Sequence, residues 1–199
     1  GINVWPWTFF LFTWSAAACG TCFTILITWI TEKLTRKKLV KDDVIQLLAK
    51  ISGWMLATYM IAKIADTIYW AMVTAPAMGF TFMDFYSNNP VYGLWIFILE
   101  IVIGGIVPAA ILITRKGREN RSLLMLAAIL AVIGVSVNRW VMVLQTLAVP
   151  VVPFESWFMY SPSWQEVATT ILPVAYGVIV ISLAHRYLPV FPQERELNP

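Results

Sequence analysis

The sequence predicts an all-α fold, a polytopic transmembrane helical bundle of about five spans. Of its 199 residues, 59% are hydrophobic and only 13% are charged, whereas soluble domains carry about 25% charged residues. Apolar runs of ~20 residues, the length that crosses a bilayer, recur along the whole chain. Ten Trp, seven Tyr and eleven Phe suit aromatic belts at the two membrane–water interfaces.

We expect one membrane domain over residues 1–199 that contains five hydrophobic spans. The spans are predicted at approximately 5–31, 44–74, 91–114, 121–147 and 165–188. The second span is long enough to tilt, or to begin as an interfacial helix at Asp42 and Asp43, which are suited to cap its N-terminus. Pro108 and Pro173 allow kinks in the third and fifth spans.

The connections between the spans predict the orientation of the bundle. Residues 31–43 and 114–121 hold five and four basic residues, whereas 75–90 and 148–164 contain no Lys or Arg. By the positive-inside rule the two basic connections are cytoplasmic and the other two lie outside. The N-terminus is then outside and the C-terminus cytoplasmic. The outer connections are rich in aromatic residues and Pro, and we expect short interfacial segments there that pack on a partner or cover a cavity.

Four ionisable residues lie inside the predicted spans. Arg139 is about eight residues, or ~12 Å, from the outer end of its span. Asp66, Glu100 and Lys63 lie about eight to eleven residues from the outer ends of theirs. All four therefore fall at nearly one depth, in the outer half of the membrane, and their charges sum to zero. Because an unpaired charge in lipid is expensive, we expect Arg139 to meet Asp66 or Glu100, and Lys63 to take the other.

This four-charge cluster has two interpretations. The first is a structural set of ion pairs that fixes the register of the helices. The second is a polar cavity where a proton or a quinol is handled, because intramembrane ionisable groups usually mark function. In that case Glu100 and Asp66 exchange protons, and Arg139 orients the two carboxylates. Asn138 and Gln145 then add hydrogen bonds in the vicinity of a quinone.

Two other signals have plainer interpretations. Cys19 and Cys22 form an isolated CGTC motif after SAAA, which favours close helix packing, since two thiols alone do not complete a zinc site. His185 is the only histidine, so the chain cannot hold a bis-histidine haem by itself. The sequence also has no Cys-rich iron–sulfur pattern and no basic patch interleaved with aromatic residues. We expect no metal site, haem or iron–sulfur cluster in this chain, and no nucleic-acid partner.

Three motifs occur in order: NRWVMVLQTL (138–147), YSPSW (160–164) and HRYLPVFP (185–192). Together they resemble the end of the NrfD/polysulfide-reductase family of integral membrane subunits, most of all its DsrP/HmeB and HybB branch. The likeness runs through about residues 45–192, and Arg139 and Tyr160 are among its motif positions, as is Trp164. Members of the family have about eight to ten spans, so the resemblance implies the C-terminal half of a larger subunit.

The resemblance implies a subunit of a respiratory redox complex in the cytoplasmic membrane of a prokaryote. Such a subunit exchanges electrons between a transiently bound quinone, menaquinone or another, and an extracytoplasmic iron–sulfur subunit. In the DsrP-like branch the complex includes cytochrome and other membrane subunits and is linked to dissimilatory sulfur metabolism. We expect the partner to dock on the outer connections at Trp157, Tyr160 and Trp164. The alternatives are a proton- or ion-translocating subunit, or a membrane anchor, with no quinone site of its own.

Overall fold

The computed structural model describes residues 5–87, 93–148 and 163–188. Within these ranges the chain forms helices and no strand. The elements are α1 (Trp5–Thr35), α2 (Asp42–Tyr69), η2 (Trp70–Thr74), α3 (Ala75–Ala77), α4 (Asp84–Ser87), α5 (Leu94–Ile98), η3 (Leu99–Ile106), α6 (Val107–Ile113), α7 (Arg115–Glu119), α8 (Arg121–Ala148) and α9 (Trp164–Tyr187).

Four helical segments are long and apolar enough to cross a membrane: Phe9–Thr35, Asp42–Ala77, Leu94–Ile113 and Arg121–Val141. They coincide with the first four predicted spans, and the chain is an all-helical, polytopic membrane protein, as predicted. The predicted fifth span corresponds to α9, whose described apolar stretch, Ala175–Ala184, is shorter. A fifth crossing therefore stays a prediction.

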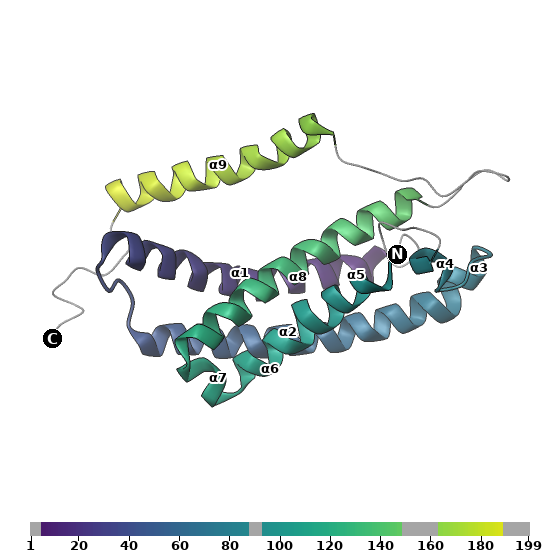
Figure 1. Ribbon diagram of the computed structural model, residues 1–199, viewed down its shortest axis with the longest axis horizontal. Coiled ribbons are helices and arrows are strands. Elements are labelled where there is room, and N and C mark those ends of the chain that lie inside the picture. The colour runs from purple at the N-terminus through teal and green to yellow at the C-terminus, as the bar shows by residue number, and fades with distance from the viewer. Residues whose placement is uncertain (1–4, 88–92, 149–162, 189–199) are drawn as a thin grey trace.

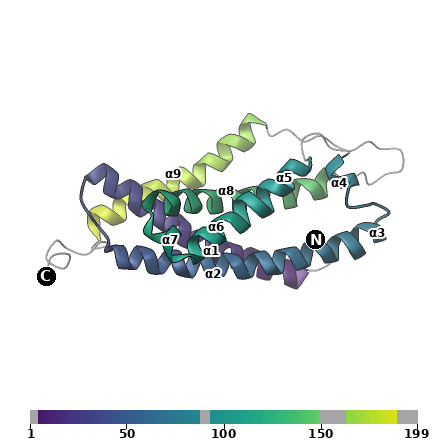
Figure 2. The ribbon, with the colours of Figure 1, turned by 60° about the horizontal axis from the view of Figure 1, so that its bottom comes forward.

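Helices α1, α2, α6 and α8, together with η3, form the bundle (Figures 1 and 2). Helix α1 packs against α2 and α8, while α8 also packs against η3 and α6. Buried small residues allow these close approaches. In particular, a Cβ atom added to Gly134 on α8 would lie 2.3 Å from the Cα of Gly104 on η3. The backbones of α8 and η3 therefore touch where no side chain fits.

Two stretches of π-helix, η2 and η3, each end shortly before a proline. The N–H of Ala75 donates to the carbonyl of Trp70, and the N–H of Val107 donates to the carbonyl of Val102. Pro76 and Pro108 follow directly. Because proline has no N–H and its ring clashes with the carbonyl four residues earlier, a wider turn before it relieves the conflict. Where the sequence allowed a kink at Pro108, the structure thus has the π-helical segment η3.

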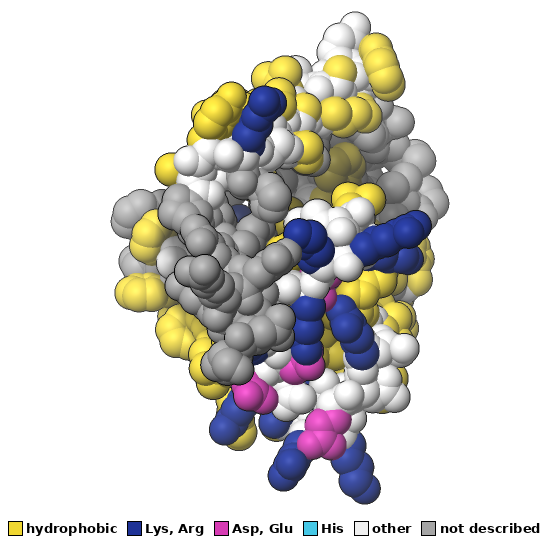
Figure 3. Space-filling view, turned by 90° about the vertical axis from the view of Figure 1, so that its left-hand side faces the viewer, with side chains coloured by type: hydrophobic (Ala, Val, Ile, Leu, Met, Phe, Trp, Pro, Cys, Tyr) yellow, Lys and Arg dark blue, Asp and Glu magenta, His cyan; other side chains and the backbone are white. Residues whose placement is uncertain are grey.

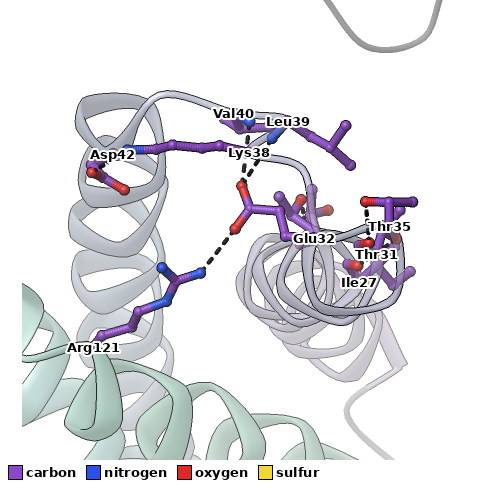
Figure 4. Close-up of polar contacts among 11 residues, drawn as sticks. Ile27, Thr31, Glu32, Thr35, Lys38, Leu39, Val40, Asp42 and Arg121 are labelled. Carbon is purple, nitrogen blue, oxygen red and sulfur yellow. Dashed lines mark hydrogen bonds and ion pairs between the residues drawn. The ribbon is translucent and has the colours of Figure 1, made fainter.

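The two basic connections lie at one end of the bundle, called here the basic end, and α3 and α4 lie at the opposite end (Figure 1). Lys and Arg side chains gather over the described surface of the basic end (Figure 3). Glu32 of α1 accepts from the backbone N–H groups of Leu39 (3.2 Å) and Val40 (3.4 Å), and it pairs with Arg121 of α8 at 2.8 Å (Figure 4). One carboxylate thus ties the first loop to α8.

The start of α2 differs from the prediction that Asp42 and Asp43 cap this helix. Lys41 is the N-cap and makes no side-chain cap hydrogen bond, while Asp42 and Asp43 belong to the first helical turn. The prediction that these acids cap the helix was therefore wrong. Asp42 instead pairs with Lys38 at 2.6 Å, and both carboxylates lie where the helix dipole favours negative charge.

At the opposite end, aromatic rings gather around α3 and α4. Trp70 and Phe85 have ring centroids 4.6 Å apart, and Phe82 lies between Tyr86 (4.8 Å) and Phe97 (5.7 Å). Such edge-to-face and tilted pairs add to the stability that burial alone gives. The connection after η2 thus contains the short helices α3 and α4, which pack against η2, α5 and α8.

The CGTC motif serves packing at Cys22, as predicted. Its side chain is fully buried beside Ala18 and contacts the hydroxyl of Ser52 on α2. Ser52 also donates to the carbonyl of Ala18 at 3.0 Å. The motif therefore lies on the α1–α2 contact.

Candidate functional site

A buried ion pair joins α2 to η3. Lys63 Nζ lies 3.3 Å from Glu100 Oε1, and the side-chain amide of Asn138 on α8 donates to the same oxygen. All three residues are buried, with at most 8% of their surface exposed. The prediction that Lys63 and Glu100 lie at nearly one level is confirmed, because these residues, 37 positions apart in sequence, meet in the bundle.

The pair lies among mainly apolar side chains. A gap beside it, lined by Leu11, Phe12, Tyr59, Lys63 and Asn138, is too narrow to hold a water molecule. In such a setting the attraction between opposite charges is strong, and the loss of their hydration is costly. The amide of Asn138 helps to offset that cost by supplying a hydrogen bond that water would otherwise make.

Arg139 is placed differently from the prediction. Its Nη2 donates to the backbone carbonyl of Phe12 at 2.8 Å and to Ser15 Oγ at 3.4 Å, and its guanidinium carbon lies 4.8 Å from the centroid of the Phe12 ring. It forms no ion pair with Asp66 or Glu100. The prediction that Arg139 pairs with one of these carboxylates was therefore wrong.

The reason is helical geometry. Successive residues of an α-helix point about 100° apart. Asn138 faces η3, so Arg139 is turned toward α1. There it is stabilised by a carbonyl, a hydroxyl and an aromatic face, which are the uncharged partners that a guanidinium accepts.

Asp66 lies one turn from Lys63 on α2, toward the end opposite the basic loops. It is partly buried and lines a pocket of ≈ 250 Å³ with Trp7, Ala65 and Tyr69. Among the described residues no hydrogen bond or ion pair engages its carboxylate. The four predicted charges thus divide into a closed pair, Lys63 with Glu100, and two separate groups, Asp66 and Arg139.

The remaining predicted residues lie at the edge of what the structure describes. Tyr160 and Trp157 fall outside the described residues, and Gln145 lies on α8 with its side chain outside the description. Trp164 is the first residue of α9 and is 74% exposed. The preceding Ser163 caps α9 through a capping box with Glu166.

Sequence reasoning missed the contribution of α1 and the form of η3. Phe12 and Ser15 hold Arg139, and Tyr59 lines the gap beside Lys63. Neither Ser15 nor Tyr59 is unusual for a membrane span, so no local pattern marked them. Glu100 lies within the π-helical segment η3, and π-helical turns occur often at functional sites. The nearby Pro108 was the available signal.

The arrangement suits proton handling. Glu100 is a carboxylate held by an ammonium and an amide, and Asp66 is a second carboxylate one helical turn from that ammonium. Carboxylates in such places act as acids and bases. Within the described ranges no group of three or more His, Cys, Asp or Glu side chains is arranged to hold a metal ion.

The chain is similar to one curated protein, the "Menaquinone reductase, integral membrane subunit" of Nitratidesulfovibrio vulgaris. The two are 47% identical over 198 residues, which is 100% of this chain and 47% of that protein. The chain thus spans about half the length of its relative. No family model matches the sequence, and no solved structure matches it significantly. The similarity is consistent with an NrfD-like membrane subunit.

Proposed function

We propose that this chain is part of the integral membrane subunit of a respiratory redox complex, where it serves electron exchange between menaquinone and an iron–sulfur partner. One observation carries the proposal: the whole chain is 47% identical to the integral membrane subunit of a menaquinone reductase. The motifs shared with the DsrP/HmeB and HybB branch support the same class and a position in the C-terminal half. They also support a prokaryotic cytoplasmic membrane, cytochrome subunits as further partners, and a link to dissimilatory sulfur metabolism.

The site fits this chemistry. Reduction of a quinone takes up two electrons and two protons, and oxidation of a quinol releases them. Glu100, Lys63 and Asp66 provide groups that hold and pass protons within the membrane, while Arg139 keeps α1 on α8. Under the positive-inside rule the site lies in the outer half of the membrane. The electrons come from or go to the redox centre of the partner, which we place on the outer face near Trp164.

The test is electron transfer between a menaquinone analogue and the redox centres of the intact, purified complex. The rate is compared among wild type, Glu100→Gln and Arg139→Gln. Matched controls are Glu119→Gln and Arg115→Gln, which change an exposed pair at the basic end. Assembly of every variant is verified by subunit composition. We expect the two site variants to lose most of the rate and the controls to keep it.

Two results oppose the proposal in different ways. If both site variants assemble and run at the wild-type rate, the charges have a structural role and do not handle protons. If the wild-type complex transfers no electrons to or from the analogue, the quinone-linked function itself is wrong. Proton translocation is then the second candidate, favoured by the buried Lys63–Glu100 pair. A membrane anchor predicts that Glu100→Gln alters assembly alone.

A further inference from the structure

The basic end of the bundle carries more positive charge than its own acidic residues neutralise (Figure 3). The connections 31–43 and 114–121 hold nine Lys and Arg but only four Asp and Glu. Three of these acids are already in ion pairs, Glu32 with Arg121, Asp42 with Lys38 and Glu119 with Arg115. Within the described ranges, several exposed cations of this end have side chains without any partner: Arg36, Lys41 and Lys116. This end therefore attracts an anion from outside the chain.

The loop that presents Arg36 is held in its shape by the protein itself. Glu32 accepts from the backbone N–H groups of Leu39 and Val40 and pairs with Arg121 (Figure 4). Arg36 directly follows α1 and has a φ of 55°, in the left-handed region that glycine adopts without strain. Glycine would therefore end α1 more favourably, and a strained arginine with an exposed side chain indicates a role for its guanidinium.

The last turns of α1 show where this loop lies relative to the membrane. Lys33 Nζ lies 5.1 Å from the centroid of the Trp29 ring, and such indole and ammonium groups are typical of the headgroup level of a bilayer. Farther from the basic end, Phe23 and Ile30 are 51% and 48% exposed. The surface of α1 thus changes from apolar to basic where the acyl chains of a lipid give way to its headgroup.

We propose that Lys33 and Arg36 bind the phosphate group of an anionic phospholipid whose acyl chains lie along α1. The planar guanidinium of Arg36 donates two parallel hydrogen bonds to the phosphate oxygens. The ammonium of Lys33 adds a second positive charge while its stem stays beside Trp29. Because Glu32 orders the loop before the lipid arrives, little conformational entropy is lost on binding.

A lipid fits this surface better than a soluble anion or an acidic protein segment. Each of these would account for the cations at the basic end. Neither would use the exposed Phe23 and Ile30, which continue the site along α1 toward the membrane core. The lipid site is separate from the buried pair of Lys63 and Glu100 and does not depend on the quinone-linked function.

The first test is the affinity of the purified complex for fluorescent phosphatidylglycerol, with phosphatidylcholine bearing the same fluorophore as the neutral lipid. The solution contains ~0.15 M salt, which largely screens charges more than about 8 Å away. We expect phosphatidylglycerol to bind more tightly, and its Kd to rise about tenfold in Arg36→Gln, the effect of losing a hydrogen bond to a charged group.

Arg115→Gln is the matched control for Arg36→Gln. It removes the same charge from the same end, at a residue already paired with Glu119, and we expect its Kd to stay within about twofold of wild type, since the lost charge was already compensated. Equal losses in the two variants would show a diffuse attraction to the whole basic end and overturn the assignment to Arg36. Equal affinity of the wild-type complex for the two lipids would overturn the proposal altogether.

The second test separates a lipid site from a mere helix end. Arg36→Gly keeps the left-handed turn and relieves its strain but removes the guanidinium. In micelles without phosphatidylglycerol, we expect the Tm of this variant to equal or exceed that of wild type. Added phosphatidylglycerol should then raise the Tm of wild type clearly more than that of Arg36→Gly. The same rise in both proteins, or a lower Tm of the variant without the lipid, would contradict the proposed role of Arg36.

A competition experiment on the wild-type complex distinguishes the lipid from other anions. Inorganic phosphate and hexaglutamate, each at millimolar concentration, are added to the complex loaded with fluorescent phosphatidylglycerol. We expect neither to displace the lipid, because neither replaces the contacts of the acyl chains with α1. Displacement by phosphate would assign the site to a soluble anion, and displacement by hexaglutamate would assign it to an acidic protein segment. Either result overturns the lipid site.

Discussion

Lys63 Nζ and Glu100 Oε1 lie 3.3 Å apart between α2 and η3, and the oxygen that they share also accepts from Asn138 on α8. One buried carboxylate thus connects three helices. Burial removes the hydration of both charges, and their mutual attraction offsets this cost only while both charges are present. Its stability therefore depends on keeping both members or removing both.

The first prediction is that the stability losses at this pair are not additive in a double-mutant cycle. Lys63→Met leaves Glu100 as an uncompensated buried charge, and we expect it to lower the free energy of unfolding by about 3–5 kcal/mol. Adding Glu100→Gln removes that charge, so the double variant is expected to lose less than the sum of the single losses. The measurement is unfolding in mixed micelles. The exposed pair Arg115 and Glu119, changed in the same way, serves as control and is expected to shift stability by ~1 kcal/mol or less. Additive losses at the buried pair would contradict the prediction.

The contact between η3 and α8 gives the second prediction. A Cβ at Gly134 would lie 2.3 Å from the Cα of Gly104, which is backbone and cannot move aside. We expect Gly134→Ala to lower the free energy of unfolding by about 1–3 kcal/mol, the usual cost of overpacking.

The matched control for this change is Gly20→Ala on α1, where a Cβ meets nothing within 4 Å. Alanine favours a helix over glycine by about 0.5–1 kcal/mol, so we expect this variant to be neutral or more stable than wild type. Equal losses at the two positions would show that the close approach at Gly134 is not the cause. The same unfolding assay measures both variants.

The first four spans and the common level of Lys63 and Glu100 were predictable because both depend on distances along the chain. Apolar length fixes where a helix crosses the membrane, and the rise per residue then gives the level of Lys63 and Glu100, which do meet. The positions of both basic loops at one end followed from the same alternation of spans.

The partners of the charges were not predictable in this way. They depend on how each helix is rotated about its axis, and a single residue step turns a side chain by about 100°. Arg139 therefore faces Phe12 and Ser15 on α1, while its neighbour Asn138 faces Glu100. The π-helical turns of η3 alter the rotation further, and one proline gives too little information to predict them.

The third prediction concerns pH and the short helix α4. The backbone N–H of Thr81 (2.7 Å) and its hydroxyl (2.8 Å) both donate to Asp84 Oδ2, and these bonds hold the pKa of Asp84 below its usual value. A group with a lowered folded pKa stabilises the fold above its unfolded pKa, ~3.9 for Asp. That contribution is lost as the pH falls through the lowered folded value.

The nearby Trp70 provides the readout for this helix, because its ring lies 4.6 Å from that of Phe85, the residue after Asp84. We expect the fluorescence of Trp70 to change in the acid range in the wild-type protein as α4 loosens. The other tryptophans are background, so Trp70→Phe identifies the signal. In Asp84→Asn the titrating group is gone, and the acid transition of Trp70 should disappear. A transition of the same midpoint in Asp84→Asn would assign it to another group.

The fourth prediction tests how Arg139 is stabilised within the membrane. Its guanidinium donates to the Phe12 carbonyl and stacks on the Phe12 ring, and hydrogen bonds from charged groups contribute about 1.5–3 kcal/mol each. We expect Arg139→Leu to lower the free energy of unfolding by roughly this amount, because α8 loses its polar contact with α1. Arg139→Lys should lose less, since the ammonium keeps the charge and one hydrogen bond but not the planar stacking.

Double variants that contain Arg139→Leu show whether α1 or a carboxylate is the partner of Arg139. Because Asp66 forms no ion pair with Arg139 among the described residues, the effects of Arg139→Leu and Asp66→Leu should add within ~0.5 kcal/mol. A direct ion pair would instead make the double variant markedly more stable than the sum of the single changes. In contrast, Arg139→Leu and Ser15→Ala should not add, since the hydroxyl of Ser15 lies 3.4 Å from the guanidinium. Unfolding of the three single and two double variants in mixed micelles thus decides whether α1 or a carboxylate compensates this charge.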